Sequence, residues 1–116
     1  TEDVRSVWLN SNGGYARAGV ALSYIIHDYR LDTHAYGDCM SACAMMWLAG
    51  DRRSYASGVE VLQHGIYLNG KPITEEQGLN RWNEILTEMY MTIIPGFSKL
   101  MIDQLQNPVN VFIKVN

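Results

Sequence analysis

The chain has 116 residues, 47% hydrophobic and 18% charged, which excludes a disordered chain and predicts one folded domain over residues 1–116. The formal net charge is −3 and no basic cluster is present, so nucleic acid is not expected as a partner, because phosphate binding needs several Lys or Arg on one face. The longest mostly apolar stretch, residues 42–49, is too short to cross a membrane, and no secretory or transit segment is recognisable.

The first half of the chain alternates short apolar strands with helical patterns. A glycine turn, Gly13-Gly14, follows the first strand, and Gly37 is expected to let the chain turn after the second one. On the first helix, Ala21, Tyr24 and Ile25 recur at the spacing of an apolar face. The pattern predicts a strand over 6–10, a helix over 16–29, a strand over 31–36, a buried helix over 41–48, and strands over 54–56 and 59–63.

The second half begins with a loop containing Asn69-Gly70. Thr74 to Gln77 matches a capping box, which predicts a long helix over about residues 75–106 that Pro95-Gly96 kinks or breaks. Alternating apolar residues over 109–115 predict a last strand. This order of strands and helices implies an α/β fold with a largely parallel sheet and right-handed crossovers.

Two cysteines, Cys39 and Cys43, lie close to Ser41 in the sequence. We expect both to be small, buried, reduced side chains, because a disulfide between them would strain a helical turn. A metal site is the alternative, but no second Cys or His pair at ligand spacing completes one. A reducing cytoplasm is then the default location, with an organelle matrix or stroma, or a host cytoplasm for a viral chain, as alternatives.

Three features together point to chemistry. Ser41 enters a helix, Gly13-Gly14 can present bare N–H groups, and His64 ends a strand. Each feature alone has a purely structural explanation, since serine is a common helix N-cap, glycines form tight turns, and a histidine at a strand end can have a structural role only. In this order they are the parts of a serine hydrolase: a nucleophile, donors for an oxyanion, and a general base.

The same residues resemble the ClpP/crotonase superfamily, and within it the proteolytic subunits of the Clp protease, over residues 7–64 and more weakly beyond. Family members have a strand ending in Asn-Ser-x-Gly-Gly, a nucleophile in Gly-x-x-x-Ser-Ala, and a following helix ending in Leu-x-Ala-Gly. The matching segments here are Asn10-Ser11-Asn12-Gly13-Gly14, Gly37-Asp38-Cys39-Met40-Ser41-Ala42, and Leu48-Ala49-Gly50, and His64 follows at the place of the family's histidine.

The resemblance implies Ser41 as nucleophile, His64 as general base, and the backbone N–H groups of Gly14 and Ala42 as the oxyanion hole. The family places an Asp third, where this chain has Asn110. Asn can orient an imidazole but cannot offset its charge, which predicts slow chemistry. Asp103 in that role, or no third member, are the alternatives.

The resemblance also implies a ClpP/crotonase-like fold of repeated β-β-α units with a protruding handle helix near residues 75–106. It implies peptides or unfolded polypeptides as substrate, and a homo-oligomer of stacked rings. No cofactor is expected in this chain. ATP would enter only through an AAA+ unfoldase partner or through cellular ClpP subunits, and the docking segment of family members is reduced here to a stub.

Three other functions are alternatives to peptidase activity. An inactive, structural or regulatory ring subunit is suggested by Asn110. A crotonase-type acyl-CoA enzyme shares the fold but lacks the Ser–His pair, and no basic site for CoA phosphates is evident. A Ser–Lys dyad would need Lys71 or Lys99, neither of which has a matching context.

Overall fold

The computed structural model describes residues 4–94, 96 and 113–116. Its contacts divide the chain into two compact units, Thr1–Gln63 with Lys114–Asn116, and His64–Ile113. This division leaves the prediction of one domain over residues 1–116 untested, and each unit is described by itself.

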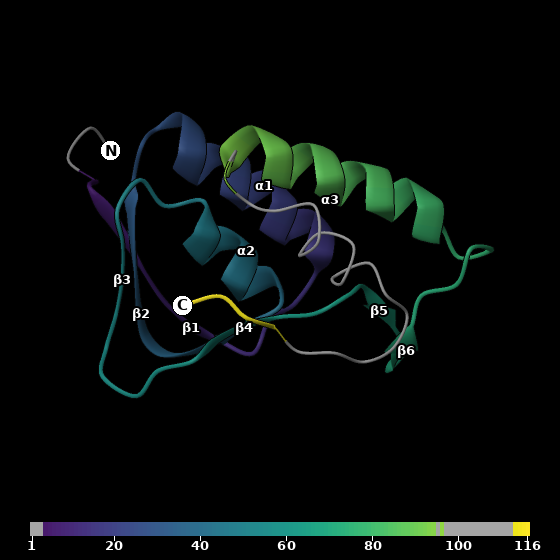
Figure 1. The fold of residues 1–116 in the computed structure, drawn as a ribbon, viewed down its shortest axis with the longest axis horizontal. Coiled ribbons are helices and arrows are strands. Elements are labelled where there is room, and N and C mark those ends of the chain that lie inside the picture. Colours follow the sequence, from purple (N-terminus) through teal and green to yellow (C-terminus); the bar gives the residue numbers. More distant parts are fainter. Residues whose placement is uncertain (1–3, 95, 97–112) are drawn as a thin grey trace. The chain divides into compact units, whose positions relative to one another are not determined.

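The first unit is a mostly parallel sheet with two helices. Its strands run in the order β1-β2-β4-β7, and β3 also pairs with β2. The elements are β1 (Ser6–Ser11), α1 (Ala16–Asp28), β2 (Asp32–Met40), α2 (Ala42–Leu48), β3 (Arg53–Tyr55), β4 (Val61–Gln63) and β7 (Ile113–Lys114), as Figure 1 traces. The predicted α/β class and largely parallel sheet are confirmed.

Strand β2 is the centre of this sheet. Along one edge it pairs in parallel with β1, with Trp8 opposite His34. Along the other edge its first half pairs with β3 and its second half with β4, where Met40 lies opposite Leu62. The end of β2 is therefore held by a neighbour up to the residue before Ser41.

Gly37 lies inside β2, so the predicted turn after Tyr36 is wrong. The register between β1 and β2 shifts at this point, because Leu9 pairs with Ala35 whereas Ser11 pairs with Cys39. Extra residues on one strand form a bulge, which bends the strand without ending it. A Cβ at Gly37 would meet the amide end of the Asn10 side chain, which would have to move to make room.

The core of the unit lies between the sheet and α2. Thr33 and Ala35 on β2 are buried, and the Thr33 hydroxyl donates a hydrogen bond of 2.7 Å to the Trp47 carbonyl. Helix α2 packs against β1, β2 and β4 and is nearly enclosed, as its apolar sequence predicts. The other face of the sheet carries Trp8, 65% exposed, with its ring 4.7 Å from that of His34.

Helix α1 buries a different face from the one expected. Gly19, Ser23 and Ile26 are buried, and the Ser23 hydroxyl donates to the Gly19 carbonyl at 2.6 Å. Small residues allow α1 to approach α2 closely, which the apolar periodicity alone did not indicate. A stripe three and four residues apart is left exposed: Tyr15, Ala18, Leu22, Ile25 and Tyr29.

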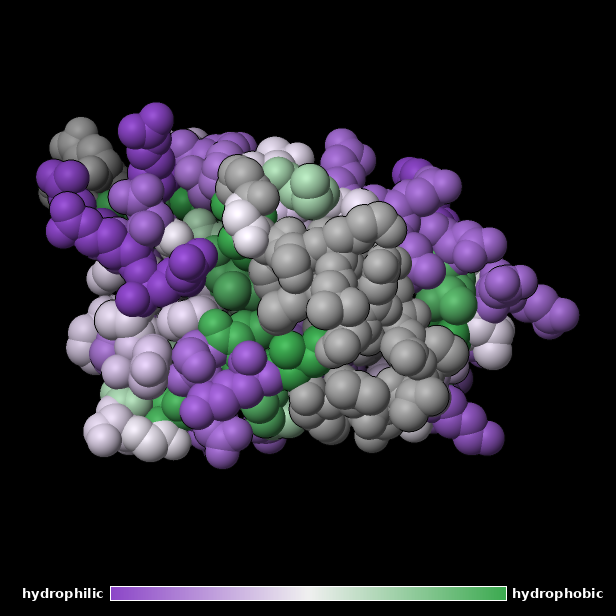
Figure 2. All heavy atoms as spheres, viewed as in Figure 1, coloured by the Kyte–Doolittle hydropathy of each residue, from purple (hydrophilic) through white to green (hydrophobic). Residues whose placement is uncertain are grey.

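Hydrophobic side chains are also exposed outside the stripe on α1. Figure 2 shows hydrophobic side chains in the middle of the face in view, bordered on the left by hydrophilic ones. Contiguous exposed apolar surface is typical of sites that bind a partner.

The second unit contains a hairpin and a helix. Strands β5 (Tyr67–Leu68) and β6 (Lys71–Pro72) are antiparallel, joined by Asn69 and Gly70 at φ of 53° and 80°. Positive φ at both central residues is the hairpin turn that an Asn-Gly pair favours, so this segment is more regular than the predicted loop.

Helix α3 (Leu79–Ile93) begins later than residue 75. The capping-box contact does form, since the Thr74 N–H donates to Gln77 Oε1 at 3.1 Å, but it closes a turn ahead of the helix. Gly78, at φ 105°, separates that turn from the helix. The predicted continuation over residues 97–106, about a third of the handle helix predicted over residues 75–106, lies outside the described residues, as does most of the strand predicted over 109–115.

Candidate active site

Ser41 stands in a sharp turn between a strand and a helix. It is the residue between β2 and α2, and its backbone has φ 59° and ψ −120°. Positive φ is uncommon for a residue with a Cβ and persists only where the surroundings impose it. A strained strand-to-helix turn with a serine at its tip is also the backbone form of a nucleophile elbow. Ser41 is neither fully buried nor fully exposed.

Two glycines allow neighbouring backbone to approach this turn. A Cβ added to Gly13 would lie 2.9 Å from the Ser41 Cβ and 3.0 Å from the Met40 carbonyl oxygen. A Cβ added to Gly19 on α1 would lie 2.8 Å from the Ala42 Cβ. The turn is therefore enclosed from the β1–α1 side by positions that only glycine fills without displacement.

Cys39 and Cys43 form a disulfide, with their Cα atoms 5.2 Å apart. The expectation of two reduced cysteines is wrong, although both are buried as predicted. The strain argument fails because the two residues do not share a helix: Cys39 lies in β2 and Cys43 in α2. The turn at Ser41 brings them within the Cα separation that disulfides span. Such bonds are typical of oxidising compartments, so this disulfide argues against the predicted cytoplasmic location. The location itself stays a prediction.

The predicted oxyanion donors differ in what surrounds them. Ala42 is the first residue of α2, and the N–H groups of a first helical turn have no partner within their helix. The positive end of the helix dipole lies at the same point. Beside Gly14 the space is open, since an added Cβ would meet nothing within 4 Å.

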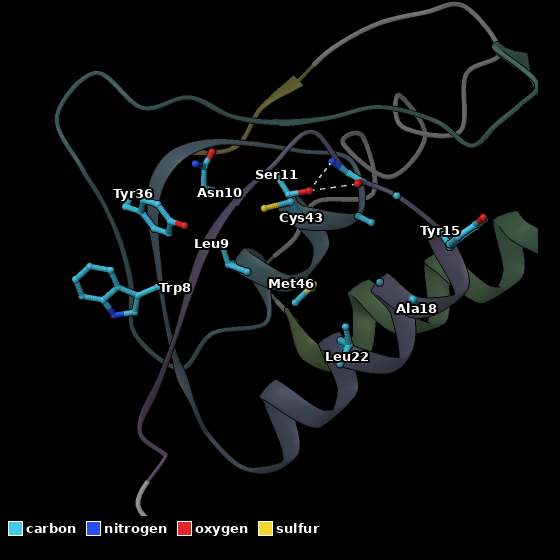
Figure 3. A pocket seen from close by; sticks show the side chains of 14 residues that line it. Trp8, Leu9, Asn10, Ser11, Tyr15, Ala18, Leu22, Tyr36, Cys43 and Met46 are labelled. Atoms are coloured by element: carbon cyan, nitrogen blue, oxygen red, sulfur yellow. Dashed lines mark hydrogen bonds between the residues drawn. The ribbon is translucent and has the colours of Figure 1, made fainter.

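A cavity of about 320 Å³ opens beside these two residues. Figure 3 shows it between β1, α1 and α2, with Ala18, Leu22 and Met46 pointing to it. Its wall is mostly apolar and aromatic, with a few polar groups: Trp8, Leu9, Asn10, Ser11, Gly13, Gly14, Tyr15, Ala18, Gly19, Leu22, Tyr36, Ala42, Cys43 and Met46. Concave apolar sites with a few polar groups are the usual form of a ligand site.

Ser11 shapes the glycine turn at the rim of this cavity. Its hydroxyl accepts a hydrogen bond from the Gly13 N–H at 3.1 Å and lies 3.2 Å from the Gly13 carbonyl, to which it donates (Figure 3). With φ of 109°, Gly13 takes a conformation that favours glycine. A local side-chain bond of this kind fixes the direction in which the chain leaves β1 toward Gly14.

His64 follows β4 directly. Its Nδ1 lies 2.6 Å from the Gly65 carbonyl, and its ring is 5.0 Å from the Tyr67 ring. A carbonyl only accepts, so Nδ1 is the protonated nitrogen of this bond, and Nε2 of the neutral ring carries the lone pair. Ser41 belongs to the first unit and His64 to the second, so the Ser41–His64 pair stays a prediction.

The strand leading to His64 does lie beside Ser41. The Ser41 N–H donates to the Leu62 carbonyl at 2.9 Å, two residues before His64 in the chain. The predicted third members, Asn110 and Asp103, lie outside the described residues.

The fold has known relatives. Eighty-seven chains of solved structures match this chain. One of them is a mutant of ClpP1 from Listeria monocytogenes. That match has a TM-score of 0.65 with 19% sequence identity, and covers 96% of this chain and 65% of the ClpP1 chain. No protein-family model and no curated protein matches the sequence. The chain therefore has a ClpP-like fold, as the resemblance implied, and spans about two thirds of the length of that neighbour.

Sequence reasoning did not find the cavity or the disulfide. The spacing of Cys39 and Cys43 around Ser41 was the available signal for the disulfide, since it needs only a chain reversal between them. Among residues 4–94, 96 and 113–116, no cluster of His, Cys, Asp or Glu is arranged to hold a metal ion. In the same part of the chain, no helix has the length and apolar character needed to cross a bilayer.

Proposed function

We propose that this chain is a serine endopeptidase of the ClpP type, hydrolysing peptide bonds in peptides or unfolded polypeptides. Ser41 is the nucleophile, His64 the general base, and the N–H groups of Gly14 and Ala42 stabilise the oxyanion. Asn110 completes the set as the residue that orients His64, in addition to the Gly65 carbonyl.

One observation carries this proposal. The cavity is lined by Gly14 and Ala42, the residues predicted as oxyanion donors, and Ser41 directly precedes Ala42 in a turn with φ 59° that lies against Gly13. A serine that only capped a buried helix would need neither a strained backbone nor an adjoining cavity, because common N-cap residues have extended dihedrals. The ClpP-like fold supports the same proposal independently.

The first half of the reaction acylates the enzyme. Nε2 of His64 takes the proton from Ser41 Oγ as that oxygen attacks the scissile carbonyl carbon. The carbonyl oxygen becomes negatively charged, and fixed backbone N–H donors stabilise it without reorganising. Collapse of this intermediate breaks the C–N bond, and the His64 imidazolium gives its proton to the leaving amine.

The second half removes the acyl group. Water loses a proton to His64 and attacks the Ser41 ester, and the same donors stabilise the second oxyanion. The acid leaves, and the proton returns from His64 to Ser41 Oγ. Without a carboxylate partner the imidazolium is less stabilised, which predicts slow turnover.

The cavity selects the acyl-side residue of the substrate. Its volume of about 320 Å³ suits one large side chain, and Leu22, Ala18 and Met46 make it apolar. Strand β1 is at the edge of the sheet formed by the described residues, so an extended peptide can add beside it.

A homo-oligomer, in the form of stacked rings, fits the exposed surface of the chain. Ile25 and Tyr29 on α1 lie outside the cavity wall and leave apolar side chains in water, 48% and 75% exposed. Burying such side chains against another subunit removes apolar area from water. An AAA+ unfoldase is proposed as a further partner, and no cofactor of this chain is required.

Labelling with a fluorophosphonate tests the function. We expect one adduct by intact-mass spectrometry on the parent chain, none on Ser41→Ala, and a rate at least about a hundredfold lower on His64→Ala, since a general base contributes roughly 10²–10⁴-fold. His34→Ala is the matched control, because His34 lies on β2 with its Nδ1 2.8 Å from the Ser54 hydroxyl and has no proposed role. A folded, assembled parent chain without an adduct would instead indicate an inactive ring subunit.

A further inference from the structure

We propose that the Cys39–Cys43 disulfide is a positioning element for the nucleophile, holding Ser41 in its reactive turn. This inference rests on the proposed function, because it assigns a role in acylation. The disulfide links the residues two before and two after Ser41, so the serine is the middle residue of the closed loop.

The bond is not compatible with an extended chain at this point. Four residues of extended strand would separate two Cα atoms by about 13 Å, whereas those of Cys39 and Cys43 are 5.2 Å apart. Cys39 is itself fixed in the sheet, opposite Val61 and with its N–H donating to the Glu60 carbonyl at 3.2 Å. Cys43 is fixed in α2. With both ends held, the reversal has to occur at Met40, Ser41 and Ala42.

Ser41 needs such a constraint. A residue with a Cβ at φ 59° relaxes toward negative φ unless its surroundings prevent it. Gly13 and Gly19 allow close packing on two sides of the turn, but packing contacts open and close with thermal motion. The disulfide is covalent and buried, with Cys39 0% and Cys43 2% exposed. It is the constraint that persists through those fluctuations.

A positioning role differs measurably from a stabilising one. The stabilisation that a disulfide gives through chain entropy grows with loop length, and this loop is among the shortest. Loss of the bond should therefore lower the melting temperature less than loss of a disulfide that closes a long loop. It should lower the rate of attack by Ser41 strongly, because reacting atoms displaced by about 1 Å can cost about a hundredfold in rate.

The test compares Cys39→Ala/Cys43→Ala with the parent chain, because serine would bury two hydroxyl groups at these enclosed positions. We expect the second-order rate constant for fluorophosphonate labelling of Ser41, and kcat for a peptide substrate, to fall at least about tenfold. KM should change less than about twofold, since most of the cavity wall is unaltered. Ile26→Val is the control: it thins the buried face of α1 two turns from Gly19 and keeps the disulfide, so it lowers stability without touching the turn.

Equal labelling rates in the parent and the double variant would overturn the inference while leaving the proposed function intact. A parent that takes no label at all would overturn the proposed function, and this inference with it. Should the double variant not fold, the parent is reduced with a water-soluble phosphine. The phosphine becomes its oxide with the oxygen of water, and the two sulfurs become thiols. With the circular dichroism spectrum retained, labelling should slow and should recover when the phosphine is removed and oxidised glutathione, which is itself reduced, re-forms the bond; an unchanged rate would contradict the proposal.

Discussion

Gly13 lies directly against Ser41: a Cβ built on Gly13 would stand 2.9 Å from the Ser41 Cβ. The two residues are far apart in the sequence and belong to the turn after β1 and the turn after β2. Because neighbouring parallel strands end at the same edge of the sheet, their two turns meet there. Gly13, the first glycine of the pair, thus packs against the turn at Ser41.

Gly13→Ala should disrupt this contact. The new methyl group meets backbone and side chain of the Ser41 turn, and alanine is strained at φ 109°. We expect kcat/KM to fall at least about tenfold and the free energy of unfolding to fall by about 1–3 kcal/mol, measured by steady-state kinetics and urea denaturation. Gly58→Ala is the matched control, since Gly58 has φ 80° with nothing within 4 Å of an added Cβ. Activity loss of equal size in both variants would show that strain alone is responsible.

Filling the cavity should impair substrate binding. Ala18→Trp places a large ring in the wall contributed by α1, whereas Ala21→Trp adds the same ring to an exposed position of the helix outside that wall. For a substrate with a large apolar acyl-side residue, we expect Ala18→Trp alone to lower kcat/KM by about tenfold or more. Labelling of Ser41 by a small fluorophosphonate should be retained. If Ala18→Trp leaves specificity unchanged, the substrate side chain binds elsewhere.

His64 should show a fixed tautomer. Since Nδ1 donates to the Gly65 carbonyl at 2.6 Å, the neutral ring should carry its proton on Nδ1. Nitrogen chemical shifts of labelled histidine measure this directly. His34 serves as the reference, because its Nδ1 faces the Ser54 hydroxyl, a group that both donates and accepts. A proton on Nε2 of neutral His64 would remove that nitrogen as the base.

Thr33→Val tests how far the core of the sheet unit depends on one buried hydrogen bond. The substitution keeps the shape of the side chain but removes the donor to the Trp47 carbonyl, 2.7 Å away in the interior. We expect the free energy of unfolding to fall by about 1–3 kcal/mol, measured by urea denaturation. Thr92→Val, at an exposed position on α3, should change it by less than about 0.5 kcal/mol. A neutral Thr33→Val would mean that the carbonyl finds another donor.

Much of the fold was predictable from local signals. The strand before Gly13, the helix starting at Ala16 and the buried helix after Ser41 follow from apolar periodicity and from glycine, and each lies within a few residues of its predicted bounds. The errors are of another kind. The sequence around Gly37 indicated a turn, but Gly37 lies in a bulge. The bulge was not predictable from local sequence because it depends on the register between β2 and β1, a contact between distant parts of the chain.

The sequence indicated candidate residues for the site, but it did not indicate how the folded chain arranges them. Motif order indicated Ser41 and the glycine pair, but the cavity needs Leu22 and Met46 from two helices to converge, which no local pattern encodes. The four-residue spacing of Cys39 and Cys43 is that of one helical turn, and for that reason the sequence did not indicate the disulfide. The reversal at Ser41 puts the two cysteines in different elements.

The disulfide has a consequence for the cell that makes this chain. Newly synthesised chains begin with both thiols reduced, and reducing compartments keep them so. On the inference drawn above, Ser41 is then poorly aligned, and the peptidase is latent while it is surrounded by the unfolded polypeptides of its own producer. Formation of the disulfide in an oxidising environment would then align the nucleophile.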